Sequence, residues 1–221
     1  MLNMSLKIKR YITKSFKKYF LESIIHNGKL LDVGCGNNSP YNIKSIRPDL
    51  YYVGLDIGVY NQSTDYSKYA NEFILTNPIN FHLKIQERQS FFDAILCAHN
   101  LEHCNDYILV TLAMIQALKK NGIMYLSFPC EESVNFPKRS NTLNFYDDPT
   151  HKNLINYVQF ISFLKNNSME ILLTTKRHRP LISFFIGLLC EPFCFFLKKQ
   201  APRGGSWALY GFESIIIAKK I

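Results

Sequence analysis

The most constraining feature of the chain is a regular alternation of strand-like apolar runs with helical stretches. The apolar runs have strand length and lie at 29–33, 51–56, 72–75, 92–98, 123–128, 169–175 and 212–219. Helical stretches separate most of them, at 40–47, 79–89, 105–119 and 153–166. Strands that alternate with helices form crossovers between parallel neighbours, so helices cover both faces of their sheet. The pattern predicts one doubly wound α/β domain with a seven-stranded, mostly parallel sheet.

The positive charge of the chain lies at its two ends. The formal net charge is +9, with seven Lys or Arg residues in 1–29 and eight from residue 176 onward. The middle, 30–175, carries eleven basic and fourteen acidic residues. A uniformly basic nucleic-acid-binding protein would not show this distribution. Basic segments around a neutral body instead favour phosphate-bearing surfaces, anionic lipid among them.

Residues 1–27 predict a basic N-terminal helix ahead of the α/β domain. Over 5–26, apolar residues recur at helical spacing with lysines among them. Such a helix either packs on the domain or binds a surface, and the sequence leaves both open. The start lacks the apolar run of a secretory signal, so we expect a cytoplasmic protein. The six cysteines include no CxxC pair, which predicts free thiols.

Residues 180–197, PLISFFIGLLCEPFCFFL, are the apolar centre of a predicted insertion at 178–206. Their length approaches that of a bilayer span, but Glu191 and Pro192 argue against crossing. Pro192 predicts a break into two short helical pieces, with Glu191 at the bend facing water or a cation. Cations flank the segment, so we expect it to cover the active site and touch the membrane peripherally, with burial as the alternative.

A glycine-rich turn follows the first predicted strand, in LLDVGCGNNSP at 30–40. Gly34 and Gly36 let the backbone turn tightly and lie against a ligand. Ser39 stands where a dinucleotide-binding GxGxxG motif has its third glycine. Asp56 ends the next strand, twenty positions after Gly36, where a carboxylate can accept hydrogen bonds from two ribose hydroxyls.

Four segments then identify a family by their content and order: LDVGCG, GLD, FDAILCAHNLEH and LKKNGIMYLSFP. Over residues 28–175 they resemble the Rossmann-like S-adenosylmethionine-dependent methyltransferases. The terminal GFESIIIAKK resembles the last, antiparallel strand of that family. The resemblance implies a methyltransferase domain over 28–221 with S-adenosyl-L-methionine as cofactor, and it says nothing of the acceptor.

The resemblance also implies which residues contact the cofactor: Asp32, Gly34, Gly36, Asp56, Asn77 and His99. In that family the glycine-rich loop lies against the methionine moiety, and the acid after the second strand holds the ribose. Asn77 stands where the family usually has an acid for the adenine amine, and its amide oxygen can still accept a hydrogen bond. His99 opens a segment that resembles the loop passing under the cofactor.

Methyl transfer to a hydroxyl needs a base near the carboxyl end of the sheet, because the hydroxyl must lose a proton. The candidates are His99 and His103 after the fourth strand, and Asp148 and His151 after the fifth. The second pair follows a long polar segment of the kind that usually carries function. We predict His151 as the base ahead of His103, with no metal, although each His could be structural. The segment 128–151 also resembles methyltransferases of surface-polysaccharide biosynthesis.

Three functions stay open at this point. The first is O-methylation of a sugar, glycolipid or related small-molecule precursor. The second is methylation of RNA or another small molecule held by the basic ends. The third is a non-enzymatic cofactor-binding subunit, which the intact glycine turn and Asp56 disfavour. The HNLE sequence at 99–102 disfavours an adenine-N6 methylase, and Ser39 disfavours an NAD-linked dehydrogenase.

Overall fold

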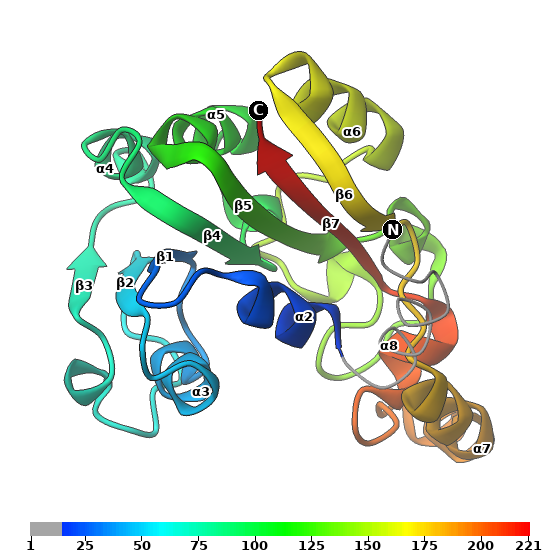
Figure 1. Ribbon diagram of the computed structural model, residues 1–221. Helices are drawn as coiled ribbons and strands as arrows, with labels where there is room; N and C mark the ends of the chain where they lie inside the picture. The colour runs from blue at the N-terminus through cyan, green and yellow to red at the C-terminus, as the bar shows by residue number, and fades with distance from the viewer. Residues whose placement is uncertain (1–14) are drawn as a thin grey trace, which may run out of the picture.

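The computed structural model describes residues 15–221, which form one twisted sheet with helices on both faces (Figure 1). Residues 5–14 of the predicted basic helix at 5–26 lie outside the described residues. The strands are β1 (Lys29–Val33), β2 (Tyr51–Asp56), β3 (Glu72–Leu75), β4 (Phe92–Ala98), β5 (Leu118–Pro129), β6 (Met169–Thr175) and β7 (Glu213–Lys220). The α-helices are α2 (Phe16–Ser23), α3 (Ser39–Ile46), α4 (Phe81–Gln86), α5 (Tyr107–Ala117), α6 (Tyr157–Asn166), α7 (Leu181–Leu197) and α8 (Gly205–Tyr210).

The strand order is β3-β2-β1-β4-β5-β7-β6. The five strands from β3 to β5 are parallel, whereas β7 runs antiparallel to both β5 and β6. This arrangement confirms the predicted seven-stranded sheet with its antiparallel last strand. In register, Val33 pairs with Leu55 of β2 and with Cys97 of β4, so the three strands end together. Loops that follow these ends therefore meet at one edge of the sheet.

Alternating side chains of the central strands supply two separate cores, one on each face. Leu31 of β1 packs in the larger core, with α4, α5 and α6 on that face. Its neighbour Leu30 packs in the other core, together with Phe20 of α2 and Ile43 of α3. Because successive strand residues point to opposite faces, each central strand must be apolar at nearly every position. The continuous apolar runs of the sequence have this origin.

Two helices begin later than the periodicity predicts because side chains cap them. Asp106 accepts the N–H of Leu109 at 2.9 Å and begins α5, and Asn156 accepts the N–H of Gln159 at 2.9 Å and begins α6. A side-chain oxygen at this position satisfies a backbone donor that has no partner within the helix.

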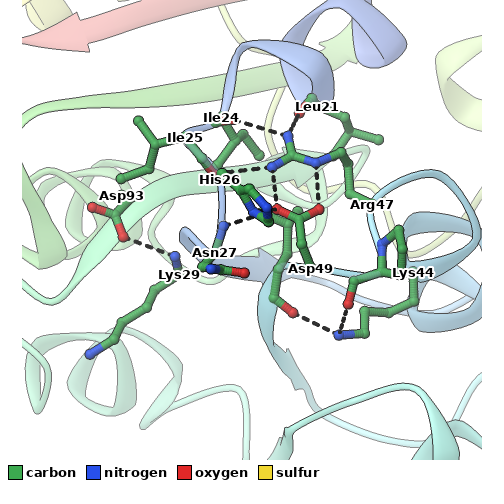
Figure 2. Close-up of polar contacts among 12 residues, drawn as sticks. Leu21, Ile24, Ile25, His26, Asn27, Lys29, Lys44, Arg47, Asp49 and Asp93 are labelled. Atoms are coloured by element: carbon green, nitrogen blue, oxygen red, sulfur yellow. Dashed lines mark hydrogen bonds and ion pairs between the residues drawn. The ribbon is translucent and has the colours of Figure 1, made fainter.

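The Arg47 side chain attaches the end of α2 to the turn before β2. Arg47 donates to the carbonyls of Leu21, Ile24 and Ile25, at 2.5, 3.0 and 3.1 Å. It also forms two bonds with the carboxylate of Asp49, each of 2.7 Å (Figure 2). Phe20 and Leu21 of α2 are buried, so this helix packs on the domain, as one of the two interpretations of the N-terminal segment predicts.

The structure corrects the predicted break at Pro192, because α7 is one continuous helix with this proline inside it. A proline removes one N–H and crowds the preceding turn. Here contacts on both sides of Pro192 hold the helix together: Cys194 is buried, and Glu191 bonds to Arg139 and Tyr210, at 2.6 Å each. The prediction that Glu191 faces a cation is confirmed. Among residues 15–221, no helix is both long and apolar enough to cross a membrane.

Candidate functional site

The loop after β1 makes a turn that only glycine adopts easily. Gly34 has a φ of 77°, and a Cβ at this position would overlap the side chain of Asn100 in the loop after β4. Its N–H donates to the carbonyl of Leu55 at 2.8 Å, which ties the loop to the end of β2. The positive φ and the close approach of Asn100 both exclude a larger residue at position 34.

Asp56 lies at the end of β2, beside the glycine loop. Its side chain is buried, and Oδ1 accepts the N–H of Ile57 at 2.7 Å. A Cβ added to Gly36 would lie 3.8 Å from Asp56 Oδ2, so the glycine leaves the approach to this carboxylate open. Burial raises the pKa of Asp56, against the lowering effect of the backbone donors at Ile57, Gly58 and Gly36.

A cavity of about 820 Å³ opens over this edge of the sheet, and Gly34, Gly36, Asp56 and His99 line it. Its volume falls within the range of roughly 300–1,000 Å³ that is typical of small-molecule sites. The rest of the lining includes these apolar side chains: Ile57, Tyr60, Ile79, Phe81, Leu109 and Val110. A second hollow of about 260 Å³ adjoins it, shares Gly34, Gly36 and His99 with it, and reaches Lys17 and Trp207.

Asp32 borders the smaller hollow, but neighbouring hydroxyls already bind its carboxylate. Ser39 and Tyr52 each donate to Asp32 Oδ2 at 2.6 Å. Burial raises the pKa of Asp32, although Lys17 and these two donors lower it. The structure therefore shows Asp32 supporting the start of α3, while its predicted contact with the cofactor stays a prediction.

His99 is held between two carboxylates on the floor of the cavity. Its Nδ1 lies 3.1 Å from Glu102 Oε1, and its Nε2 lies 3.2 Å from Glu213 Oε1. Because each ring nitrogen faces an acceptor-only oxygen, the imidazole carries both protons. Burial alone would lower the pKa of His99, but the two carboxylates outweigh it and raise the pKa to about 10. Trp207 packs beside the ring, with centroids 5.1 Å apart.

Asn77 does not line the cavity, although the next two residues, Pro78 and Ile79, do. Its Oδ1 accepts the N–H of Asn80 at 2.8 Å, in the turn before α4. The loop after β3 thus reaches the cavity through apolar groups and not through the predicted amide. The predicted contact of Asn77 with adenine stays a prediction.

His103 lines the cavity and belongs to a hydrogen-bonded relay with Thr150 and Asp148. The hydroxyl of Thr150 donates to Asp148 Oδ1 at 2.6 Å and lies 2.8 Å from His103 Nδ1. Because the Thr150 hydroxyl donates its proton to Asp148, Nδ1 of His103 must be the donor in the second bond. In the neutral ring the lone pair then sits on Nε2. Burial lowers the pKa of His103, despite the raising effect of Glu102.

His151 lies beside His103, with ring centroids 4.8 Å apart, but it does not line either cavity. Only 4% of its side chain is exposed. Its Nδ1 donates to the carbonyl of Phe145 at 2.6 Å, and its Nε2 lies 4.0 Å from Asp148 Oδ2. The structure thus brings the three predicted catalytic residues together and places only His103 at the cavity.

Glu102 lies next to His103 and His151. It is fully buried, and its Oε2 has no hydrogen-bond partner within residues 15–221. One ligand atom each of Glu102, His103 and His151 lies within 4.8 Å of the others, so these residues could hold a cation. The cluster marks a place where a cation could bind, and the predicted absence of a metal stays a prediction.

The comparisons with known proteins agree with this geometry. The family described as "Methyltransferase domain" matches residues 5–173. The chain belongs to this family. Its fold is similar to that of an S-adenosylmethionine-dependent methyltransferase from Archaeoglobus fulgidus, with a TM-score of 0.56, 16% identity and coverage of 99% and 100% of the two chains. It is also similar to one from Mesorhizobium loti, with a TM-score of 0.61, 12% identity and coverage of 90% and 95%.

Among curated proteins, the chain is 29% identical over 121 residues to a ubiquinone biosynthesis O-methyltransferase of Pelagibacter ubique. The match covers 54% of this chain and 50% of that protein, so the chain spans about half the length of the curated relative. These comparisons confirm the predicted family and fold. They say nothing of the resemblance to enzymes of polysaccharide biosynthesis.

Sequence reasoning missed several residues of this methyltransferase domain that the structure brings to the site. Glu213 reaches His99 from a position 114 residues away, and Trp207 comes from α8 between β6 and β7. Thr150 lies inside the predicted segment, but only its two bonds reveal that it orients His103. Contacts between distant segments leave no periodic signal in the sequence.

Proposed function

We propose that the chain transfers a methyl group from S-adenosylmethionine to a hydroxyl of a small-molecule acceptor, with His103 as general base. The observation that carries the proposal is the relay from Asp148 through Thr150 to His103, which leaves Nε2 of a cavity-lining histidine free to accept a proton. A base of this kind serves an acceptor that must lose a proton as its oxygen attacks.

The residues around the cavity fit the cofactor. Gly34 and Gly36 expose backbone at the junction of the two hollows, and Asp56 offers a buried carboxylate oxygen beside them. We place the ribose hydroxyls at Asp56, and the methionine end in the smaller hollow, where Lys17 can pair with a carboxylate. When bound, the cofactor supplies an electrophilic methyl group on a positively charged sulfur.

The charge on the cavity floor supports binding of the positively charged sulfur. His99 is positive, and Glu102 and Glu213 face it from both sides. Burial would raise the pKa of Glu213, but the bond and charge of His99 hold it below its usual value. The group of three side chains therefore has a net charge of about −1, which favours a sulfonium above it. In the reaction the acceptor oxygen bonds the methyl carbon, the carbon–sulfur bond breaks, and the hydroxyl proton goes to His103.

The geometry supports His103 as the base, whereas the sequence ranks His151 first. His151 is buried and donates to a backbone carbonyl, so we assign it a positioning role beside the His103 ring. His103 faces the cavity, and its lowered pKa keeps it neutral and able to accept a proton near neutral pH. Asp148 contributes through Thr150, because it fixes which nitrogen of His103 carries the proton.

For the acceptor we propose a sugar, a glycolipid or a related small-molecule precursor. The resemblance of segment 128–151 to surface-polysaccharide methyltransferases supports the sugar classes. The name of the Pelagibacter protein, an O-methyltransferase, supports oxygen as the acceptor atom. RNA receives less support, because Lys152 is the only Lys or Arg among the described residues that line the larger cavity.

Two experiments test the proposal. Mass spectrometry of glycoconjugates and lipids from cells with and without the gene should show one species that differs by a single methyl group. With that acceptor in hand, His103→Gln should lower kcat by roughly a hundredfold or more and leave the affinity for S-adenosylhomocysteine unchanged. His26→Gln is the control, because His26 is exposed and lies away from the cavity. Full activity of the His103 variant would refute the assignment of the base.

A further inference from the structure

Helix α7 exposes a long apolar stripe that the described fold does not cover. Ile182, Phe185, Leu189, Phe193 and Phe196 recur three or four residues apart and so share one face of the helix. Phe185, the least exposed of the five, is 53% exposed, and Phe196 is 83% exposed. Contiguous apolar surface of this kind marks a binding surface on a soluble domain.

The opposite face of α7 attaches the helix to the domain. Gly187 and Cys194 are its only buried residues, and a Cβ on Gly187 would overlap the carbonyl of Gly205 in α8. The two helices therefore touch backbone to backbone, and α7 lies on the outer side of α8, away from the sheet (Figure 1). Most of the large apolar side chains of α7 are exposed.

Exposed cations stand at both ends of this apolar stripe. Arg179 precedes α7, and Lys198, Lys199 and Arg203 follow it, and all four are exposed. The only acid within α7 is Glu191, which is paired with Arg139 on the inner face. Within residues 15–221, the outer side of α7 thus combines apolar groups with positive charge and no acidic side chain of its own.

We propose that α7 docks on an anionic lipid bilayer and lies in the plane of the interface, with its apolar stripe among the acyl chains. An interfacial helix needs an apolar face and cations that reach the headgroups at its margins, and α7 has both. This inference concerns the placement of the protein and does not depend on the acceptor or on the base.

Charge favours a bilayer over a second copy of the chain as the occupant. If two α7 helices paired through their stripes, either orientation would bring cations at the helix ends against cations of the other copy. An antiparallel pair would set Arg179 near Lys198 and Lys199, and a parallel pair would set each cation near its own counterpart. An anionic surface instead neutralises every one of these groups.

Docking through α7 would also bring the active site to the membrane. Arg139 belongs to the segment that leads to Asp148 and Thr150, and it donates to Glu191 of α7 at 2.6 Å. Its own N–H donates to Asp147 Oδ2 at 3.1 Å. On the other side, α8 carries Trp207 to the smaller hollow. Both partners of α7 therefore reach the site, so a docked helix holds the cavity close to the lipid surface.

Flotation of the full chain with lipid vesicles tests the proposal. The wild type should float with phosphatidylcholine vesicles that contain phosphatidylglycerol, but not with phosphatidylcholine alone, and high salt should weaken the binding. The double variant L189E/F193E should lose flotation. Lys198→Gln with Lys199→Gln should weaken it by roughly twenty-five-fold, at about fivefold for each cation near the surface. Val158→Glu is the matched control, because Val158 is 65% exposed on α6, and it should float like the wild type.

Further measurements separate a loss of membrane binding from a loss of folding or from dimerisation. Thermal unfolding monitored by circular dichroism should be alike for all variants, because the substituted side chains are exposed. Phe193→Trp should shift its fluorescence to the blue with anionic vesicles, which reports insertion without disrupting the helix. Flotation on neutral vesicles equal to that on anionic ones would overturn the proposal, as would a wild type that binds no vesicle. In the latter case, a dimer that L189E/F193E dissociates would show that a second copy covers the stripe.

Discussion

Replacing Glu213 by Gln should lower the free energy of unfolding most near pH 6, because Glu213 is one of two carboxylates that hold His99 protonated. The ring nitrogens of His99 lie 3.1 Å from Glu102 and 3.2 Å from Glu213, so the carboxylates act at nearly equal distance. A histidine with a raised pKa stabilises the fold fully below its unfolded pKa. That contribution is lost as the pH rises through the folded pKa.

The magnitude follows from the pKa of His99, which is 6.5 in the unfolded chain and about 10 in the fold. The interval of about 3.5 pH units corresponds to about 5 kcal/mol at about 1.4 kcal/mol per unit. Because the two distances are alike, roughly half of this, about 2 kcal/mol, belongs to Glu213. The free energies of unfolding of the wild type and of Glu213→Gln should therefore differ by about 2 kcal/mol at pH 6 and converge above pH 10.

Urea unfolding across this pH range measures the difference, and an NMR titration of the His99 ring, assigned with a His99→Gln variant, measures the pKa directly. Glu170→Gln is the control, because Glu170 is exposed on β6 and the change removes the same charge. Its free energy of unfolding should follow that of the wild type at every pH. If His99 of the wild type titrates near 6.5, or if the effect of Glu213→Gln does not vary with pH, the reasoning is refuted.

Three further predictions concern the cofactor loop and the N-terminal helix. Asp56→Asn should weaken binding of S-adenosylhomocysteine by roughly 1–3 kcal/mol in calorimetry, because the ribose hydroxyls lose a charged acceptor; unchanged affinity would exclude Asp56 from the site. Gly34→Ala should abolish this binding and lower the melting temperature, because alanine at a φ of 77° meets the Asn100 side chain; a fully stable variant that binds would show that the loop can shift. Arg47 holds the pKa of Asp49 well below its usual value, so the stability that this pair provides is present above pH 3.8 and is lost as the pH falls further. In Asp49→Asn, the free energy of unfolding should therefore fall less steeply below pH 4 than in the wild type, and an equally steep fall would contradict this.

The sequence predicted the sheet well because the strands are buried on both faces. β1, β2, β3, β4 and β6 begin and end where their apolar runs do. The glycine turn and Asp56 also line one cavity, since a turn after one strand and an acid after the next must meet at the same edge. These features depend on residues close in the chain, and local patterns report them.

Only the tertiary structure distinguishes the surroundings of His103 from those of His151. Both histidines lie in polar segments that follow neighbouring strands, and the sequence holds nothing that orients either ring. His103 faces the cavity because Thr150 bonds to it from the other loop, and His151 is turned to the carbonyl of Phe145. Such a difference arises from the packing of two loops against each other.

For helix α7, too, the sequence indicated some features and the tertiary contacts decided others. Composition identified the apolar insertion and its flanking cations, but Pro192 suggested a break that the fold does not make. Contacts with α8 and with Arg139 hold α7 in one continuous helix and decide which of its faces points outward. The amino-acid order by itself determined the family, the sheet and the edge at which the glycine turn meets Asp56, because these follow from hydrophobic period and local turns. Only the tertiary structure placed His99 between two carboxylates, His103 at the cavity and the apolar stripe on the outside, because each depends on groups that the chain brings together from afar.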